Sequence, residues 1–68
     1  MRGAEIVAIA MDHGWTDHGP GGKHPYILKR KGALRPVPVR DKLENKEEVR
    51  GILKQLEIPK GEWPEKVK

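Results

Sequence analysis

One histidine of the chain has the surroundings that RNA cleavage requires. His24 follows the glycine-rich segment 19–22, stands beside Lys23, and opens an extended run predicted to lie within reach of Arg30 and Arg35. Imidazole can accept and return a proton near neutral pH. A general base beside cations is the minimum needed to cleave RNA without a metal, because the cations stabilise the charge developing on the phosphate. A histidine at a strand end is more often structural, so the residues alone leave both interpretations open.

Residue types that the chain lacks exclude most other chemistries. It has no cysteine, hence no disulfide, Cys-ligated zinc or thiol nucleophile, and no serine, hence no serine triad. The segment Gly19–Lys23 departs from the phosphate-loop pattern GxxxxGK[ST], since Asp17 occupies the place of the first glycine and His24 that of the hydroxyl residue. The spacings between His13, His18 and His24 match no metal-ligand pattern. We therefore expect neither a metal nor a cofactor.

Basic residues gather in the middle of the chain. The formal net charge is +4, and most acidic residues follow position 40. Segregated positive charge is typical of a phosphate-binding surface, although a solvated face without a ligand has the same composition. We predict that Lys23 and Arg35 contact RNA phosphates, with Lys29 and Arg30 behind them. The whole basic set is Lys23, Lys29, Arg30, Lys31, Arg35, Arg40 and Lys42.

A first helix and three extended runs are predicted to position these residues. The helix ends at Gly14, with Val7 outside its apolar face, which comprises Ile6, Ile9, Ala10 and His13. Extended runs are predicted over residues 14–18, 24–30 and 33–39. Lys31 and Gly32 suit a tight hairpin between the second and third runs. Pro36 and Pro38 remove N–H donors from one side of the third run, which predicts an edge strand with both prolines outward.

The C-terminal part of the chain predicts a second helix. Asn45 suits its N-cap, and Glu48 three residues later is expected to close a capping box. Pro59 should end the helix, Trp63 should return to the core, and residues 64–68 are expected to form a frayed tail. The apolar face of this helix is predicted to comprise Val49, Ile52, Leu53 and Leu56.

Together these elements predict one α+β domain over residues 1–68. The order is α-β-β-β-α, with a three-stranded antiparallel sheet that has both helices on one face and leaves the other face free. No apolar run approaches the ~20 residues of a membrane span, and the first residues lack the apolar stretch of a signal peptide. We therefore expect a cytoplasmic protein without a membrane partner.

Three segments resemble the HicA family of small toxins from toxin–antitoxin pairs. They are GKHPY (Gly22–Tyr26), PVPV (Pro36–Val39) and RGILKQLEI (Arg50–Ile58), which follow an N-terminal helix ending in Gly14-Trp15. The resemblance implies a fold like that of double-stranded-RNA-binding domains and an endoribonuclease that cleaves mRNA, with His24 as the catalytic residue. It also implies a HicB-type antitoxin as the partner that blocks the site.

The resemblance has one departure, at position 23. The family commonly has Gly-Ser-His, whereas this chain has Gly22-Lys23-His24. Lysine there would either strengthen phosphate binding or mark a lineage whose nuclease is lost or altered. Two alternatives to a ribonuclease therefore remain: a non-catalytic RNA-binding module of the same fold, and a basic module that docks an acidic protein. RNA that is bound, with or without His24, but stays intact would indicate the first, and absence of RNA binding the second.

Overall fold

The N-terminal helix shows a different apolar face from the predicted one. The computed structural model describes all residues 1–68, and helix α1 spans Gly3–Met11. Its buried residues are Gly3, Ile6, Val7 and Ala10, whereas Ile9 is only half-buried. The prediction that Val7 lies outside the apolar face is therefore wrong. The helix is rotated because Gly3 at its first turn is pressed against the backbone that follows β3 (Val37–Val39).

The sheet has the predicted order but shorter strands. Strands β1 (Thr16–Asp17), β2 (Tyr26–Lys29) and β3 pair antiparallel in the order β1-β2-β3. Register pairs Tyr26 with Val39 and Leu28 with Val37. β3 is thus an edge strand as predicted, with Pro38 exposed between two buried valines. Pro36 precedes the paired region and is also exposed.

The connection between β2 and β3 is a loop of residues 30–36 rather than a tight hairpin. A turn does form at the predicted place, where the Ala33 N–H donates to the Arg30 carbonyl oxygen (3.0 Å) and Gly32 has φ +90°. Pairing resumes only at Val37, and within the loop Leu34 points into solvent, 99% exposed. The loop carries Arg35 away from the sheet.

Helix α2 (Lys46–Gln55) is as predicted except for its capping box. The Asn45 side chain accepts a hydrogen bond from the Glu47 N–H (2.8 Å), so Asn45 is the N-cap. Glu48 does not return to the Asn45 backbone, since its carboxylate lies 3.8 Å from Arg40 instead. The predicted apolar face is confirmed, with Val49, Ile52, Leu53 and Leu56 all buried.

The last residues are docked on α2 and are not frayed. The chain leaves the helix through Glu57 (φ +58°) before Pro59 and forms two 3₁₀ helices, η1 (Lys60–Glu62) and η2 (Glu65–Val67). Trp63 returns to the core as predicted. Val67 is only 2% exposed, and Arg50 donates to its carbonyl oxygen (2.8 Å). This contact from α2 holds the predicted tail in place.

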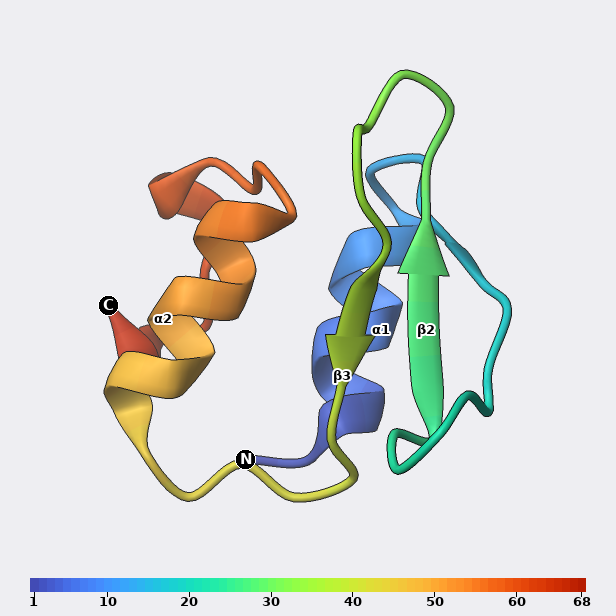
Figure 1. Ribbon diagram of the computed structural model, residues 1–68. Helices are drawn as coiled ribbons and strands as arrows, with labels where there is room; N and C mark the ends of the chain where they lie inside the picture. The colour runs from blue at the N-terminus through green and yellow to red at the C-terminus, as the bar shows by residue number, and fades with distance from the viewer.

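A single apolar core joins the sheet to both helices. Leu28, Val37 and Val39 face the same side of the sheet and belong to one cluster with the buried residues of α1 and α2. Figure 1 shows α1 behind β2 and β3, and α2 beside β3. The Trp15 indole N–H donates to the Leu56 carbonyl oxygen (3.0 Å), which ties the start of β1 to the end of α2. Neither helix is long and apolar enough to cross a membrane.

Candidate functional site

A tight turn fixes His24 just before β2. Gly21 and His24 exchange two backbone hydrogen bonds, each 3.0 Å long, across Gly22 and Lys23. Gly22 has φ +57°, a conformation that glycine adopts at no steric cost. Lys23 is exposed on the turn and His24 is half-buried. The turn therefore presents a cation and an imidazole side by side.

The His24 side of this turn lines a shallow groove between β3 and α2. Residues from three parts of the fold meet there: the turn before β2, the exposed side of β3 with the residue after it, and one face of α2. The groove has a volume of about 350 Å³. Its lining comprises His24, Pro38, Arg40, Glu48, Gly51, Ile52 and Gln55.

The groove brings together a base, a cation and a carboxylate. Arg40 Nη1 lies 3.8 Å from Glu48 Oε2, and the two side chains are 66% and 37% exposed. An exposed pair at this distance contributes little free energy, so Arg40 can exchange Glu48 for an anionic ligand. The His24 imidazole has no hydrogen-bond partner within the chain. Imidazole and guanidinium together can move a proton and bind a phosphate.

The other predicted phosphate contacts lie at the opposite end of β2. Since β2 runs from Tyr26 to Lys29, His24 precedes it whereas Arg30 and Arg35 follow it. The expectation that Arg30 and Arg35 lie within reach of His24 is therefore wrong. The physical reason is the extended backbone, which advances about 3.3 Å per residue and separates the two ends of a strand.

Arg30 is engaged in the fold itself. Its guanidinium lies 4.8 Å from the centre of the Trp15 ring and pairs with the Glu57 carboxylate. Lys29 and Arg35 are exposed, Lys29 at the end of β2 and Arg35 on the 30–36 loop. We call Lys29, Arg30, Lys31 and Arg35 the Arg30 end of the sheet.

Sequence reasoning missed two residues of the groove. The sequence places Arg40 in the basic set without a specific role, and it predicts that Glu48 closes a capping box. Pro38 and Arg40 are two positions apart, so an extended chain presents both on the exposed side of the edge strand. That alternation could have indicated Arg40, whereas the approach of Glu48 depends on how α2 packs.

The remaining histidines lie outside the groove. His13 Nε2 lies 3.2 Å from Glu62 Oε1, and His18 Nε2 lies 2.8 Å from the Thr16 hydroxyl. No group of three or more His, Cys, Asp and Glu side chains is placed to hold a metal ion.

The chain has no match among protein-family models, curated proteins or solved structures. The groove that contains His24, Arg40 and Glu48 is therefore the feature that indicates a function.

Proposed function

We propose that this chain binds RNA and cleaves it without a metal, with His24 as the general base. The observation that supports this function is the groove in which a half-buried imidazole and the Arg40 guanidinium share one lining. Lys23, exposed beside His24, adds a second cation for phosphate. Lys29 and Arg35 lie too far along β2 to touch the same phosphate, and they act as outlying contacts.

The reaction is an internal phosphoryl transfer. His24 accepts the proton of the ribose 2′-OH, and the 2′-oxygen attacks the adjacent phosphorus. The bond from phosphorus to the 5′-oxygen breaks, leaving a 2′,3′-cyclic phosphate and a 5′-OH that takes up a proton from the imidazolium or from water. Arg40 and Lys23 stabilise the negative charge that increases on the phosphate oxygens in the transition state.

The same proposal places the chain among HicA-like toxins, acting on mRNA in the cytoplasm and opposed by a HicB-type antitoxin. Two features support it: the α-β-β-β-α order, and a histidine held by a glycine-containing turn before the second strand. Lys23 stands where that family commonly has serine. In this chain its ammonium is free of ion pairs and can serve phosphate binding.

The test is cleavage of a long single-stranded RNA in excess EDTA by wild type, His24→Gln and His18→Gln. A general base contributes about 10²–10⁴-fold, so His24→Gln should slow cleavage at least 100-fold. His18 is a matched control, because it is an exposed histidine outside the groove. His18→Gln should cleave within about twofold of wild type, as surface substitutions change little.

A second readout separates loss of chemistry from loss of folding. A 2′-O-methyl strand cannot be cleaved, so its binding reports the folded RNA-binding surface alone. His24→Gln should bind it nearly as well as wild type. Cleavage by His24→Gln at the wild-type rate would overturn the role of His24. Binding of the strand by a wild type that leaves RNA intact would indicate the non-catalytic module, and no binding would indicate a protein-docking module.

A further inference from the structure

Two cations are held side by side where the N-terminus meets the segment after β3. Arg2 and Lys42 form an isolated antiparallel bridge. The flanking hydrogen bonds run from the Gly3 N–H to the Asp41 carbonyl (2.7 Å) and from the Leu43 N–H to the Met1 carbonyl (2.8 Å). Arg2 and Lys42 therefore form a non-hydrogen-bonded antiparallel pair. In such pairs the Cα atoms lie about 4.5 Å apart, closer than in hydrogen-bonded pairs.

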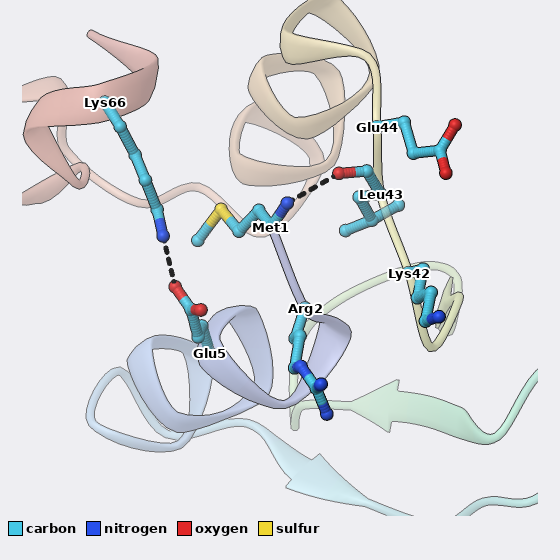
Figure 2. Close-up of a pocket in the computed structure, with 7 residues that line it drawn as sticks. All are labelled: Met1, Arg2, Glu5, Lys42, Leu43, Glu44 and Lys66. Atoms are coloured by element: carbon cyan, nitrogen blue, oxygen red, sulfur yellow. Dashed lines mark hydrogen bonds and ion pairs between the residues drawn. The ribbon is translucent and has the colours of Figure 1, made fainter.

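No carboxylate neutralises this pair. Neither Arg2 nor Lys42 has an ion pair, and like charges directly opposite each other destabilise a sheet. Glu5 is bound by Lys66 (2.9 Å), and that hydrogen bond lowers the pKa of the Glu5 carboxyl. Figure 2 shows Glu44 pointing away from both cations. An anion bound between Arg2 and Lys42 would relieve their repulsion.

The pair continues the groove of His24. Arg40 lines both that groove and a neighbouring depression, which it shares with Lys42. Lys42 in turn lines a third depression together with Arg2, the one drawn in Figure 2. The three depressions therefore adjoin through shared residues. A row of cations leads from His24 over Arg40 to Lys42 and Arg2.

Gly3 allows the backbone at the start of α1 to pack closely against the segment that carries Arg40 and Lys42. An added Cβ at Gly3 would lie 1.9 Å from the Arg40 carbonyl oxygen, so only glycine allows α1 to begin this close to the segment after β3. The N-cap Arg2 makes no side-chain hydrogen bond to the helix. The partial positive charge of the helix N-terminus adds to that of the two side chains.

We infer that the RNA strand bound at His24 runs along this row, with Arg40, Lys42 and Arg2 binding successive phosphates. The inference rests on the proposed function, and it specifies the path of the substrate. It also implies recognition of the backbone rather than of bases, since no Trp, Tyr or Phe side chain lines the three depressions. Cleavage should therefore show weak sequence preference.

The experiment measures binding of a fluorescein-labelled 2′-O-methyl strand over a series of salt concentrations. The variants are Arg2→Ala/Lys42→Ala and, as a matched control, Lys31→Ala/Lys60→Ala, which also removes two exposed cations. Each phosphate contact on a single strand contributes about 0.7 to the slope of log K against log salt. The first variant should lose about 1.4 of slope and bind at least about tenfold more weakly in low salt. The control should keep nearly the wild-type slope.

Four outcomes decide the inference. Loss of slope in Arg2→Ala/Lys42→Ala alone supports the path. Equal losses in the two double variants would overturn it, because binding would then follow net charge. Wild-type binding by Arg2→Ala/Lys42→Ala, from a protein that still cleaves RNA, would overturn the path and leave the proposed function standing. Absence of any binding by wild type would overturn both together.

Discussion

The two ends of the sheet are both basic, but their charges are used differently. At the Arg30 end, the guanidinium of Arg30 lies over Trp15 and pairs with Glu57. At the other end, which we call the His24 end, Arg40 has only a long contact with Glu48, and the remaining cations have no ion pair. The His24 end comprises Lys23, His24, Arg40, Lys42 and Arg2.

This difference separates stability from binding. A cation that is stacked and paired within the fold stabilises the folded state, and a ligand could recruit it only by breaking those contacts. Unpaired cations lower stability by mutual repulsion and are available to phosphate. Arg30 should therefore contribute mainly to folding, and the His24 end mainly to RNA binding and cleavage.

Arg40→Ala gives the largest effect expected from this comparison. Removing one group that stabilises transition-state charge typically costs about 10²–10³-fold in rate, so cleavage should fall by about 100-fold. The free energy of unfolding should change by less than about 0.5 kcal/mol, because Arg40 is exposed and its only ion pair is long. Lys31→Ala is the control at the Arg30 end, because Lys31 is also exposed, and it should cleave nearly as wild type. Similar rates for the two variants would remove the distinction between the ends.

Gly3→Ala tests the backbone that supports the His24 end. Glycine-to-alanine changes usually stabilise helices, but here the new Cβ would meet the Arg40 carbonyl oxygen at 1.9 Å. We expect a loss of about 2–3 kcal/mol in the free energy of unfolding, measured by urea denaturation.

Gly51→Ala is the matched control within α2. A Cβ at Gly51 has no atom within 4 Å, so this change should stabilise the protein by about 0.5–1 kcal/mol. A gain of stability in Gly3→Ala equal to that in Gly51→Ala would show that α1 does not press on the segment after β3.

Elements governed by local spacing were predictable from the sequence. The apolar face of α2 and its Asn45 cap follow from residues within a few positions of one another, and both are confirmed. The edge position of β3 followed from its prolines. The adjacency of Lys23 and His24 is likewise local, so half of the candidate site was evident before the fold.

Features that depend on distant packing were not predictable. Arg50 holds Val67 from seventeen positions away, and no local pattern shows that the tail is docked. Glu48 approaches Arg40 only because α2 lies beside β3 and shares its apolar core. The engagement of Arg30 by Trp15 and Glu57 similarly joins residues that flank β1, β2 and α2, and it gives a predicted RNA contact a role in the fold.

Arg30→Ala tests most directly whether Arg30 serves the fold. A cation over an indole contributes about 0.5–2 kcal/mol, more where the pair is removed from water, and here Trp15 is buried and Arg30 half-buried. The ion pair with the exposed Glu57 adds up to about 1 kcal/mol. We expect the free energy of unfolding to fall by about 1 kcal/mol in urea, followed by the fluorescence of Trp15 and Trp63. Arg30→Lys should restore only part of this loss, since an ammonium lacks the planar face that stacks on an indole.

Binding of the 2′-O-methyl strand gives the opposing readout for the same variant. Arg30→Ala should weaken binding no more than Lys31→Ala does, because both remove one charge from the same end of the sheet. If Arg30→Ala were as stable as Lys31→Ala but bound RNA far more weakly, Arg30 would be an RNA contact. In that case the two ends would act as one continuous binding surface, and the contacts with Trp15 and Glu57 would give way when RNA binds.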